Sequence, residues 1–123
     1  MTVDLNSLNP EQRAAVTHTE GALMVLAGAG SGKTRVIAAR IGYLVHTRKV
    51  PPTSILAVTF TNKAAREMLE RVGKLMPSAE RPTVCTFHAF GVRLLRAHIG
   101  LLGYRPGFAI FDTQDQLSVV RTI

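Results

Sequence analysis

The residues best suited to do chemistry in this chain form the stretch AGAGSGKT, residues 27–34. A phosphate-binding loop is written G-x-x-x-x-G-K-[ST], so an alanine stands here in place of the first glycine of the pattern. That position needs a small side chain for a tight turn at the end of a strand, and Ala27 meets this need. The sequence therefore predicts a site for the phosphates of a nucleotide.

Each part of this loop has an expected task. Its glycines let the backbone curl so that the N–H groups point inward as an anion nest, and the positive end of the next helix adds to the attraction. The Lys33 ammonium would reach the β- and γ-phosphates, and the Thr34 hydroxyl would hold the Mg²⁺ that bridges the same oxygens. The residues expected to cradle the nucleotide are Ala27, Gly28, Ala29, Gly30, Ser31, Gly32, Lys33 and Thr34.

Two residues outside the loop bear on which nucleotide would bind. Gln12 lies in NPEQ, before the apolar run that leads to the loop, and a glutamine amide can pair with N6 and N7 of adenine. This pairing would select ATP over GTP, whereas the alternative is a solvated helix glutamine. Arg35 directly follows Thr34, and we expect it either to lie against a base or ribose or to be a solvated helix arginine.

A second motif, TFTNKAAREM over residues 59–68, follows another apolar run. Thr59, Thr61 and Asn62 offer neutral hydrogen bonds to phosphate oxygens, and they surround the aromatic Phe60. Such a pattern suits single-stranded nucleic acid, because each base that stacks on a ring contributes about 1–3 kcal/mol. The alternative is that Phe60 belongs to the core and Asn62 caps a helix.

A third motif, TFHAF over residues 86–90, repeats this arrangement. Thr86 and His88 are expected where a loop meets a helix. His88 would suit a general base or a metal ligand, but no carboxylate or second ligand lies near it in the sequence. A backbone or phosphate contact is the favoured role.

These motifs are positioned by an alternation of short apolar runs and helical patterns, which predicts an α/β fold: a parallel sheet with flanking helices. Ligands of open parallel sheets bind at the carboxyl ends of the strands, so the three motifs are expected to share one edge. The expected strands are residues 22–27, 55–60 and 83–87. Five helices are expected. The first follows Asn9, the second follows Thr34, the third carries Ala65, Met68, Leu69, Val72 and Met76 on one face, the fourth runs from Val92 to about Gly103, and the last begins near Asp112.

The composition narrows the class of protein. The 123 residues suffice for one domain, and the net charge of +7 favours an acidic partner, nucleic acid first, although a basic but inert surface is the alternative. Cys85, the single cysteine, is expected to be buried in a strand rather than to act as a nucleophile, and it favours a reducing, cytoplasmic setting. No apolar run reaches the roughly 18 residues of a membrane span.

Asp112 ends the apolar run FAIF and resembles the carboxylate that holds Mg²⁺ in ATP-driven motors. No glutamate follows it, and Asp115 comes three residues later. We therefore expect Asp112 to cap a helix whose first turn is acidic.

The stretches LNPEQRAAV, AGAGSGKTRV, AVTFTNKAAREM and TFHAFGVRLLR resemble the Q motif and motifs I, Ia and Ib of superfamily 1 DNA helicases of the UvrD/Rep/PcrA type. Order and spacing agree over most of the chain, the loop is written as that family writes it, and the Rep-like members look nearest. The resemblance implies a P-loop NTPase (RecA-like) fold. Residues 1–111 would be the N-terminal part of motor domain 1A, and residues 112–123 the start of a helical insertion, 1B.

The resemblance also implies an ATP-driven 3′-to-5′ translocase that unwinds DNA in replication and repair. Gln12 would contact adenine, with Arg35 near the base. Single-stranded DNA and duplex junctions would be partners, together with a second motor domain of the same chain. The residues that would contact the DNA are Phe60, Thr61, Asn62, Thr86, Phe87 and His88.

The family's magnesium-binding carboxylates, written around DEYQD, are expected beyond the helical insertion and do not occur in these 123 residues. We therefore expect this stretch to be the N-terminal part of a longer helicase that neither hydrolyses ATP at a useful rate nor unwinds DNA alone. Two alternatives are another P-loop phosphotransferase and a non-enzymatic nucleic-acid-binding module with a vestigial loop.

Overall fold

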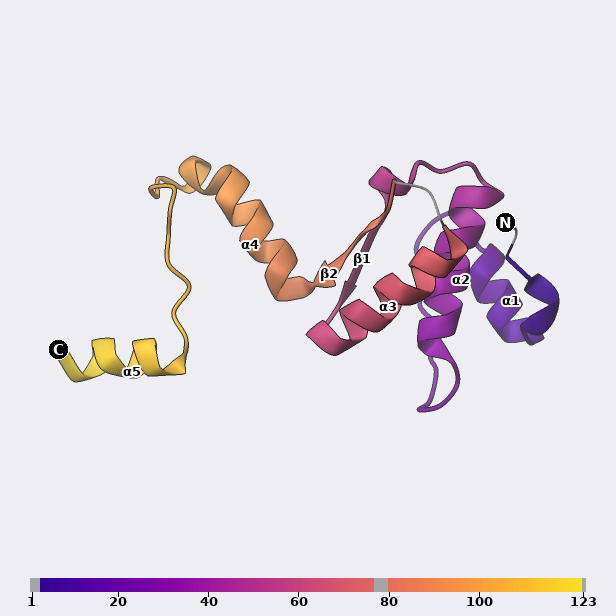
Figure 1. The fold of residues 1–123 in the computed structure, drawn as a ribbon, viewed down its shortest axis with the longest axis horizontal. Coiled ribbons are helices and arrows are strands. Elements are labelled where there is room, and N and C mark those ends of the chain that lie inside the picture. The colour runs from indigo at the N-terminus through magenta and orange to yellow at the C-terminus, as the bar shows by residue number, and fades with distance from the viewer. Residues whose placement is uncertain (1–2, 77–79, 123) are drawn as a thin grey trace. The chain divides into compact units, whose positions relative to one another are not determined.

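The computed structural model describes residues 3–76 and 80–122 of this chain. The chain divides into two compact units, one that ends at His88 and one that begins at Ala89 (Figure 1). This division is not the boundary expected between residues 111 and 112. That boundary separates the motor domain 1A from the insertion 1B, and it stays a prediction. Within the described residues, no helix is both long enough and apolar enough to cross a membrane.

The first unit begins with a short 3-10 helix, η1 (Leu5–Ser7), and the helix α1 (Pro10–Thr17). Asn9 caps α1 as expected: its Oδ1 accepts from the Gln12 N–H at 2.8 Å, and the Gln12 Oε1 accepts from the Asn9 N–H at 3.1 Å. This reciprocal pair satisfies two backbone donors that would otherwise be free at the helix start. The cap therefore fixes both where α1 begins and where the Gln12 amide lies.

The helix α2 (Lys33–His46) lies between α1 and α3 (Asn62–Leu75) and packs against both. A β-carbon added at Gly42 would lie 2.8 Å from Val3 Cγ2 and 3.3 Å from Leu75 Cδ1, so glycine permits this close approach. Polar contacts tie the same helices together, because Arg40 donates to the Ala15 carbonyl, and His46 Nε2–H donates to the Leu75 carbonyl at 2.8 Å.

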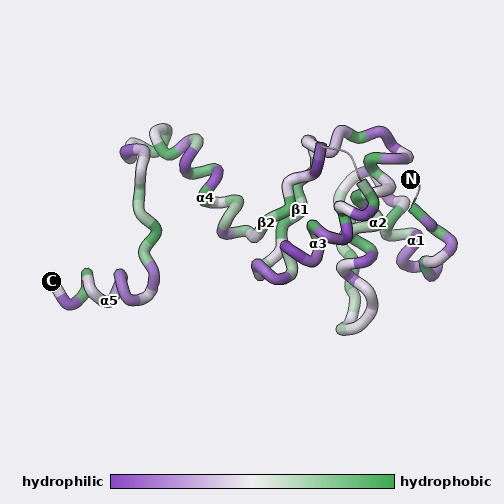
Figure 2. The backbone as a smooth tube through the Cα atoms, viewed as in Figure 1, coloured by the Kyte–Doolittle hydropathy of each residue, from purple (hydrophilic) through white to green (hydrophobic). Residues whose placement is uncertain are grey.

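Two parallel strands, β1 (Leu56–Thr59) and β2 (Thr83–Thr86), form the sheet, with the 3-10 helix η2 (Pro52–Ser54) before β1. Both strands confirm the prediction to within one residue at their ends, except that Phe87, expected in the strand, begins the helix α4 (Phe87–His98). The helix α3 covers the sheet with an apolar face, and its outer residues are hydrophilic (Figure 2). The core between α2, α3 and the strands consists of Ala38, Ile41, Ala57, Met68, Val72, Met76 and Val84.

The expected first strand, residues 22–27, is wrong for this structure. These residues pair with no strand among those described, and the run is open to solvent, with Met24 82% and Leu26 87% exposed. A strand forms only where a neighbour supplies backbone hydrogen bonds, and among the described residues neither β1 nor β2 pairs with this run. Apolar composition alone therefore could not make this run a strand.

The second unit contains most of α4 (Phe87–His98), the 3-10 helix η3 (Ile99–Leu102) and α5 (Thr113–Thr122). The helical stretch ends at Gly103 as expected, in the left-handed conformation with φ 79°. Asp112 accepts from the Asp115 N–H at 2.8 Å, and the Asp112 N–H donates to the Asp115 carboxylate at 3.1 Å. The prediction that Asp112 caps this helix is confirmed.

Met68 offers a test of the core, because only 4% of its surface is exposed between α3 and the strands. The variant Met68→Ala should lower the free energy of unfolding by about 2–5 kcal/mol, through lost burial and the cavity left behind. Urea-induced unfolding monitored by circular dichroism measures the change. The control Glu67→Ala, one position along on the exposed face of α3, should stay within about 0.5 kcal/mol. Similar losses in the two variants would contradict the assigned core.

Candidate functional site: a phosphate-binding loop and an exposed aromatic pair

The loop AGAGSGKT connects the apolar run to α2 in a conformation that depends on two of its glycines. Gly30 has φ 74° and Gly32 has φ 82°, both in the left-handed region that residues with a β-carbon rarely adopt. A β-carbon at Gly30 would meet no heavy atom within 4 Å, so backbone conformation rather than lack of space explains the glycine there. Gly32 directly precedes Lys33 as the N-cap of α2, which places the loop at the positive end of that helix.

Lys33 folds back over the loop. Its Nζ donates to the Ala27 carbonyl at 3.3 Å and to the Gly28 carbonyl at 3.2 Å. The Gly28 carbonyl also accepts from the Ser31 hydroxyl at 2.7 Å. An ammonium has three donors, so one stays available to an anion at the mouth of the loop. Thr34 follows in the first turn of α2 and is half-buried. This donor set suits the phosphates of a nucleotide with its Mg²⁺.

Gln12 reaches this loop from α1. Its Nε2 donates to the Ser31 carbonyl at 3.0 Å, while its Oε1 accepts from the Asn9 N–H. A carboxamide has two donor hydrogens and two acceptor lone pairs, so one donor and one acceptor remain for a base. The amide is thus held by the cap on one side and by the loop on the other. No sequence pattern predicts the contact between Gln12 and Ser31, since the two residues are 19 positions apart.

A cavity of about 530 Å³ lies beside the loop. Gln12, Gly28, Ser31 and Lys33 line its polar part. Its apolar wall includes Leu23, Val25, Leu26, Val36 and Ile37. The volume lies in the range of pockets for small ligands, about 300–1,000 Å³. The structure therefore places Gln12 and Lys33 around one hollow.

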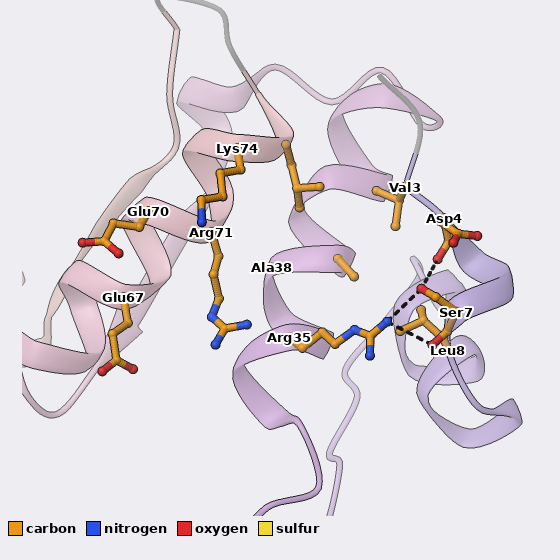
Figure 3. A pocket seen from close by; sticks show the side chains of 12 residues that line it. Val3, Asp4, Ser7, Leu8, Arg35, Ala38, Glu67, Glu70, Arg71 and Lys74 are labelled. Carbon is orange, nitrogen blue, oxygen red and sulfur yellow. Dashed lines mark hydrogen bonds between the residues drawn. The ribbon is translucent and has the colours of Figure 1, made fainter.

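Arg35 lies elsewhere. Its Nη2 donates to the Ser7 carbonyl at 3.0 Å and to the Ser7 hydroxyl at 2.8 Å (Figure 3). It lines a second cavity of about 510 Å³, between η1, α2 and α3, in which Ala38, Glu67 and Arg71 also lie. The structure does not bring the Arg35 guanidinium to the loop, and its contact with a base stays a prediction.

An exposed aromatic pair follows the two strands. Phe60 and Phe87 come directly after β1 and β2, and their ring centroids lie 5.3 Å apart at an interplanar angle of 46°. Phe60 is 80% exposed, so the alternative that it belongs to the core is wrong. Aromatic pairs at this separation contribute about 0.5–1.5 kcal/mol beyond their burial, but most of the Phe60 ring still meets water. So large an exposed ring suggests a binding surface.

Polar groups of the two motifs surround this pair. Thr61 rather than Asn62 caps α3, because its hydroxyl accepts from the Ala64 N–H at 3.1 Å, so the alternative of an Asn62 cap is wrong. Asn62 and His88 are exposed. Thr59 is half-buried, and Thr86 is 7% exposed, so solvent meets the rings and not the Thr86 side chain.

The comparisons with known proteins agree with these features. The family model described as the UvrD/REP helicase N-terminal domain matches residues 8–123. This chain belongs to the UvrD/REP helicase family. The resemblance stated from the four motifs is thereby confirmed.

Three similar proteins carry helicase names. The chain is 52% identical over 120 residues to the ATP-dependent DNA helicase PcrA of Bacillus subtilis, covering 97% of this chain and 16% of that protein. It is 50% identical over 124 residues to PcrA of Staphylococcus aureus, covering 100% and 17%. It is 48% identical over 122 residues to the ATP-dependent DNA helicase UvrD1 of Mycobacterium leprae, covering 97% and 16%. The chain thus spans about 16–17% of the length of these relatives.

Gln12 provides a test of base recognition. The variant Gln12→Ala should reduce the preference for ATP over GTP by about 5- to 100-fold, because a bidentate amide–base contact is worth about 1–3 kcal/mol. Competition of ATP and GTP against a fluorescent nucleotide measures the ratio in the protein at its full natural length. The control Asn9→Ser keeps a cap acceptor at the start of α1 and should preserve the ratio. An unchanged ratio in Gln12→Ala would exclude Gln12 from base selection.

Proposed function

We propose that this chain is the ATP-binding and single-stranded-DNA-contacting N-terminal part of an ATP-dependent 3′-to-5′ DNA helicase that acts in replication or repair. The observation that carries the proposal is that one compact unit holds both a lysine-bearing phosphate loop and an exposed aromatic pair at the ends of parallel strands. Both lie in motifs of the family to which the chain belongs. Residues 1–111 would form part of a RecA-like motor domain 1A, with the helical insertion 1B from residue 112.

ATP would bind with its phosphates in the loop. With Gly30 and Gly32 left-handed, backbone N–H groups of the loop would turn toward the phosphates, and the start of α2 would add positive potential. Lys33 would exchange its bonds to the Ala27 and Gly28 carbonyls for phosphate oxygens, and Thr34 would hold Mg²⁺. The bound Mg²⁺·ATP supplies the phosphoryl group for transfer, while these residues bind it and neutralise its charge.

Single-stranded DNA would lie across the ends of β1 and β2. A base would stack on Phe60, which is open to solvent, and exposed polar groups of Thr61 and Asn62 would meet the backbone phosphates. Lys63 and Arg66 follow on exposed positions of α3, in a chain of net charge +7. The α2 and α3 helices begin on the same side of the unit (Figure 1), so the nucleotide and the DNA would approach the same side.

The remaining parts of the reaction would come from other segments. A carboxylate pair that activates water, and arginines of a second motor domain, complete an ATP-driven motor in this proposal. This stretch alone would then neither turn over ATP usefully nor separate strands at a duplex junction. A cytoplasmic location belongs to the same proposal.

Lys33 tests the nucleotide half of the proposal. In the protein at its full natural length, Lys33→Ala should weaken ATP binding about 10- to 100-fold and abolish hydrolysis, because a charge-assisted contact to phosphate is lost. Nucleotide titration and phosphate release measure the two effects. The control Lys74→Ala removes another exposed lysine of the same unit and should change neither. Wild-type affinity and turnover in Lys33→Ala would contradict the proposal.

Phe60 tests the DNA half. The variant Phe60→Ala should weaken binding of a single-stranded oligonucleotide about 5- to 100-fold while ATP affinity stays unchanged, because only base stacking is removed. Fluorescence anisotropy measures both ligands in the protein at its full natural length. Phe60→Tyr keeps the ring and should retain most of the affinity. Equal DNA binding by Phe60→Ala and wild type would remove the stacking role.

A further inference from the structure

We infer that Phe87 is a positioning residue, which holds the Phe60 ring so that the pair presents one stacking surface to one base. The inference rests on the proposed binding of single-stranded DNA. In the alternative, Phe87 would contact DNA independently, and each ring would bind its own base. The evidence lies in the register of the strands, the geometry of the rings and the unequal exposure of the two side chains.

The register of the sheet brings the two rings together. Thr59 of β1 pairs with Thr86 of β2 as the last pair of the ladder, so Phe60 and Phe87 directly follow the neighbouring ends of two parallel strands. Neighbouring strands lie about 4.8 Å apart, so the two residues leave the sheet close together. The adjacent strand ends bring the two rings within reach of each other, and their centroids lie 5.3 Å apart.

The ring geometry leaves no room for a base between the two residues. Carbon atoms in contact lie about 3.5–4.0 Å apart, so a base held between two rings would require roughly 7–8 Å between them. The centroids are 5.3 Å apart, and the ring planes are inclined by 46°. A base can therefore stack only on an outer face of the pair.

The exposure of the rings shows which one offers that face. Phe60 is 80% exposed, whereas Phe87 is 49% exposed. Phe87 is the first residue of α4, so its backbone is fixed by a helix, while Phe60 is the single residue between β1 and the Thr61 cap. Phe87, held at the start of α4, thus supports the more exposed ring of Phe60. Restricting the rotamers of Phe60 before binding lowers the entropy lost when a base stacks.

A double-mutant cycle in the protein at its full natural length tests the inference. The variants are Phe60→Ala, Phe87→Ala and the double variant, and the ligand is a single-stranded oligonucleotide that contains 2-aminopurine. We expect Phe60→Ala to weaken binding about tenfold and Phe87→Ala about threefold. The double variant should bind no more weakly than Phe60→Ala, because Phe87 has no effect without the ring it supports.

Two further readouts separate positioning from general damage. Quenching of 2-aminopurine on binding reports stacking, and Phe87→Ala should reduce it even at saturating protein. Phe87→Tyr keeps the supporting ring and should restore both quenching and affinity. If Phe87→Ala proves unstable by thermal unfolding, Phe87→Leu retains apolar bulk, and its smaller loss of quenching should likewise vanish in the Phe60→Ala background.

The outcomes distinguish this inference from the function on which it rests. Additive losses in the double variant would mean that Phe87 contacts DNA by itself, which overturns the positioning role and leaves DNA binding intact. Unchanged binding in all three variants would overturn both. The inference is supported if Phe87→Ala loses affinity and quenching only when Phe60 is present, and if Phe87→Tyr restores both.

Discussion

The parallel pairing of β1 with β2 is the constraint on which the exposed aromatic pair of this protein depends. Its register, with Thr59 opposite Thr86, sets where both chains leave the sheet and therefore where Phe60 and Phe87 emerge. The sheet has only two strands among the described residues, so its buried face depends on α3. Burial of Met68 and Val72 against Ala57 and Val84 holds the pairing in place. Packing on one face of the sheet thus supports the exposed rings at its end.

The helix α2 connects the core beside β1 and β2 to the loop AGAGSGKT. One side of α2 contributes Ala38 and Ile41 to the core with α3, and Ala39 packs with Leu8 and Val16 in a second cluster. Its first residue is Lys33. The position of the loop is therefore fixed by the packing of α2 in these two apolar clusters rather than by a strand before the loop. Gln12 adds a polar link, since its amide joins the cap of α1 to the Ser31 carbonyl.

Local signals were sufficient where a feature depends on neighbours in the chain. The sequence predicts Asn9 and Asp112 as helix caps, and both caps bond to backbone groups three residues away. The apolar face of α3 repeats at helical spacing, so its buried residues followed from the sequence as well. The prediction of a strand at residues 22–27 is wrong because a strand requires a partner, and apolar composition carries no information about which strands pair. Phe60 is hydrophobic yet exposed, so hydrophobicity alone left two alternatives open.

The sequence by itself determined the chemistry available to this protein: a loop with Lys33 and Thr34, a glutamine at residue 12, and aromatic residues after two apolar runs. Order and spacing of these motifs also identified the helicase family, which the family model then confirmed. Only the tertiary structure decided which groups meet. It brought Gln12 to Ser31, Phe60 to Phe87, and Arg35 to Ser7 rather than to the loop. These contacts join residues 19 to 28 positions apart, and such pairs are fixed by packing and strand register rather than by local spacing.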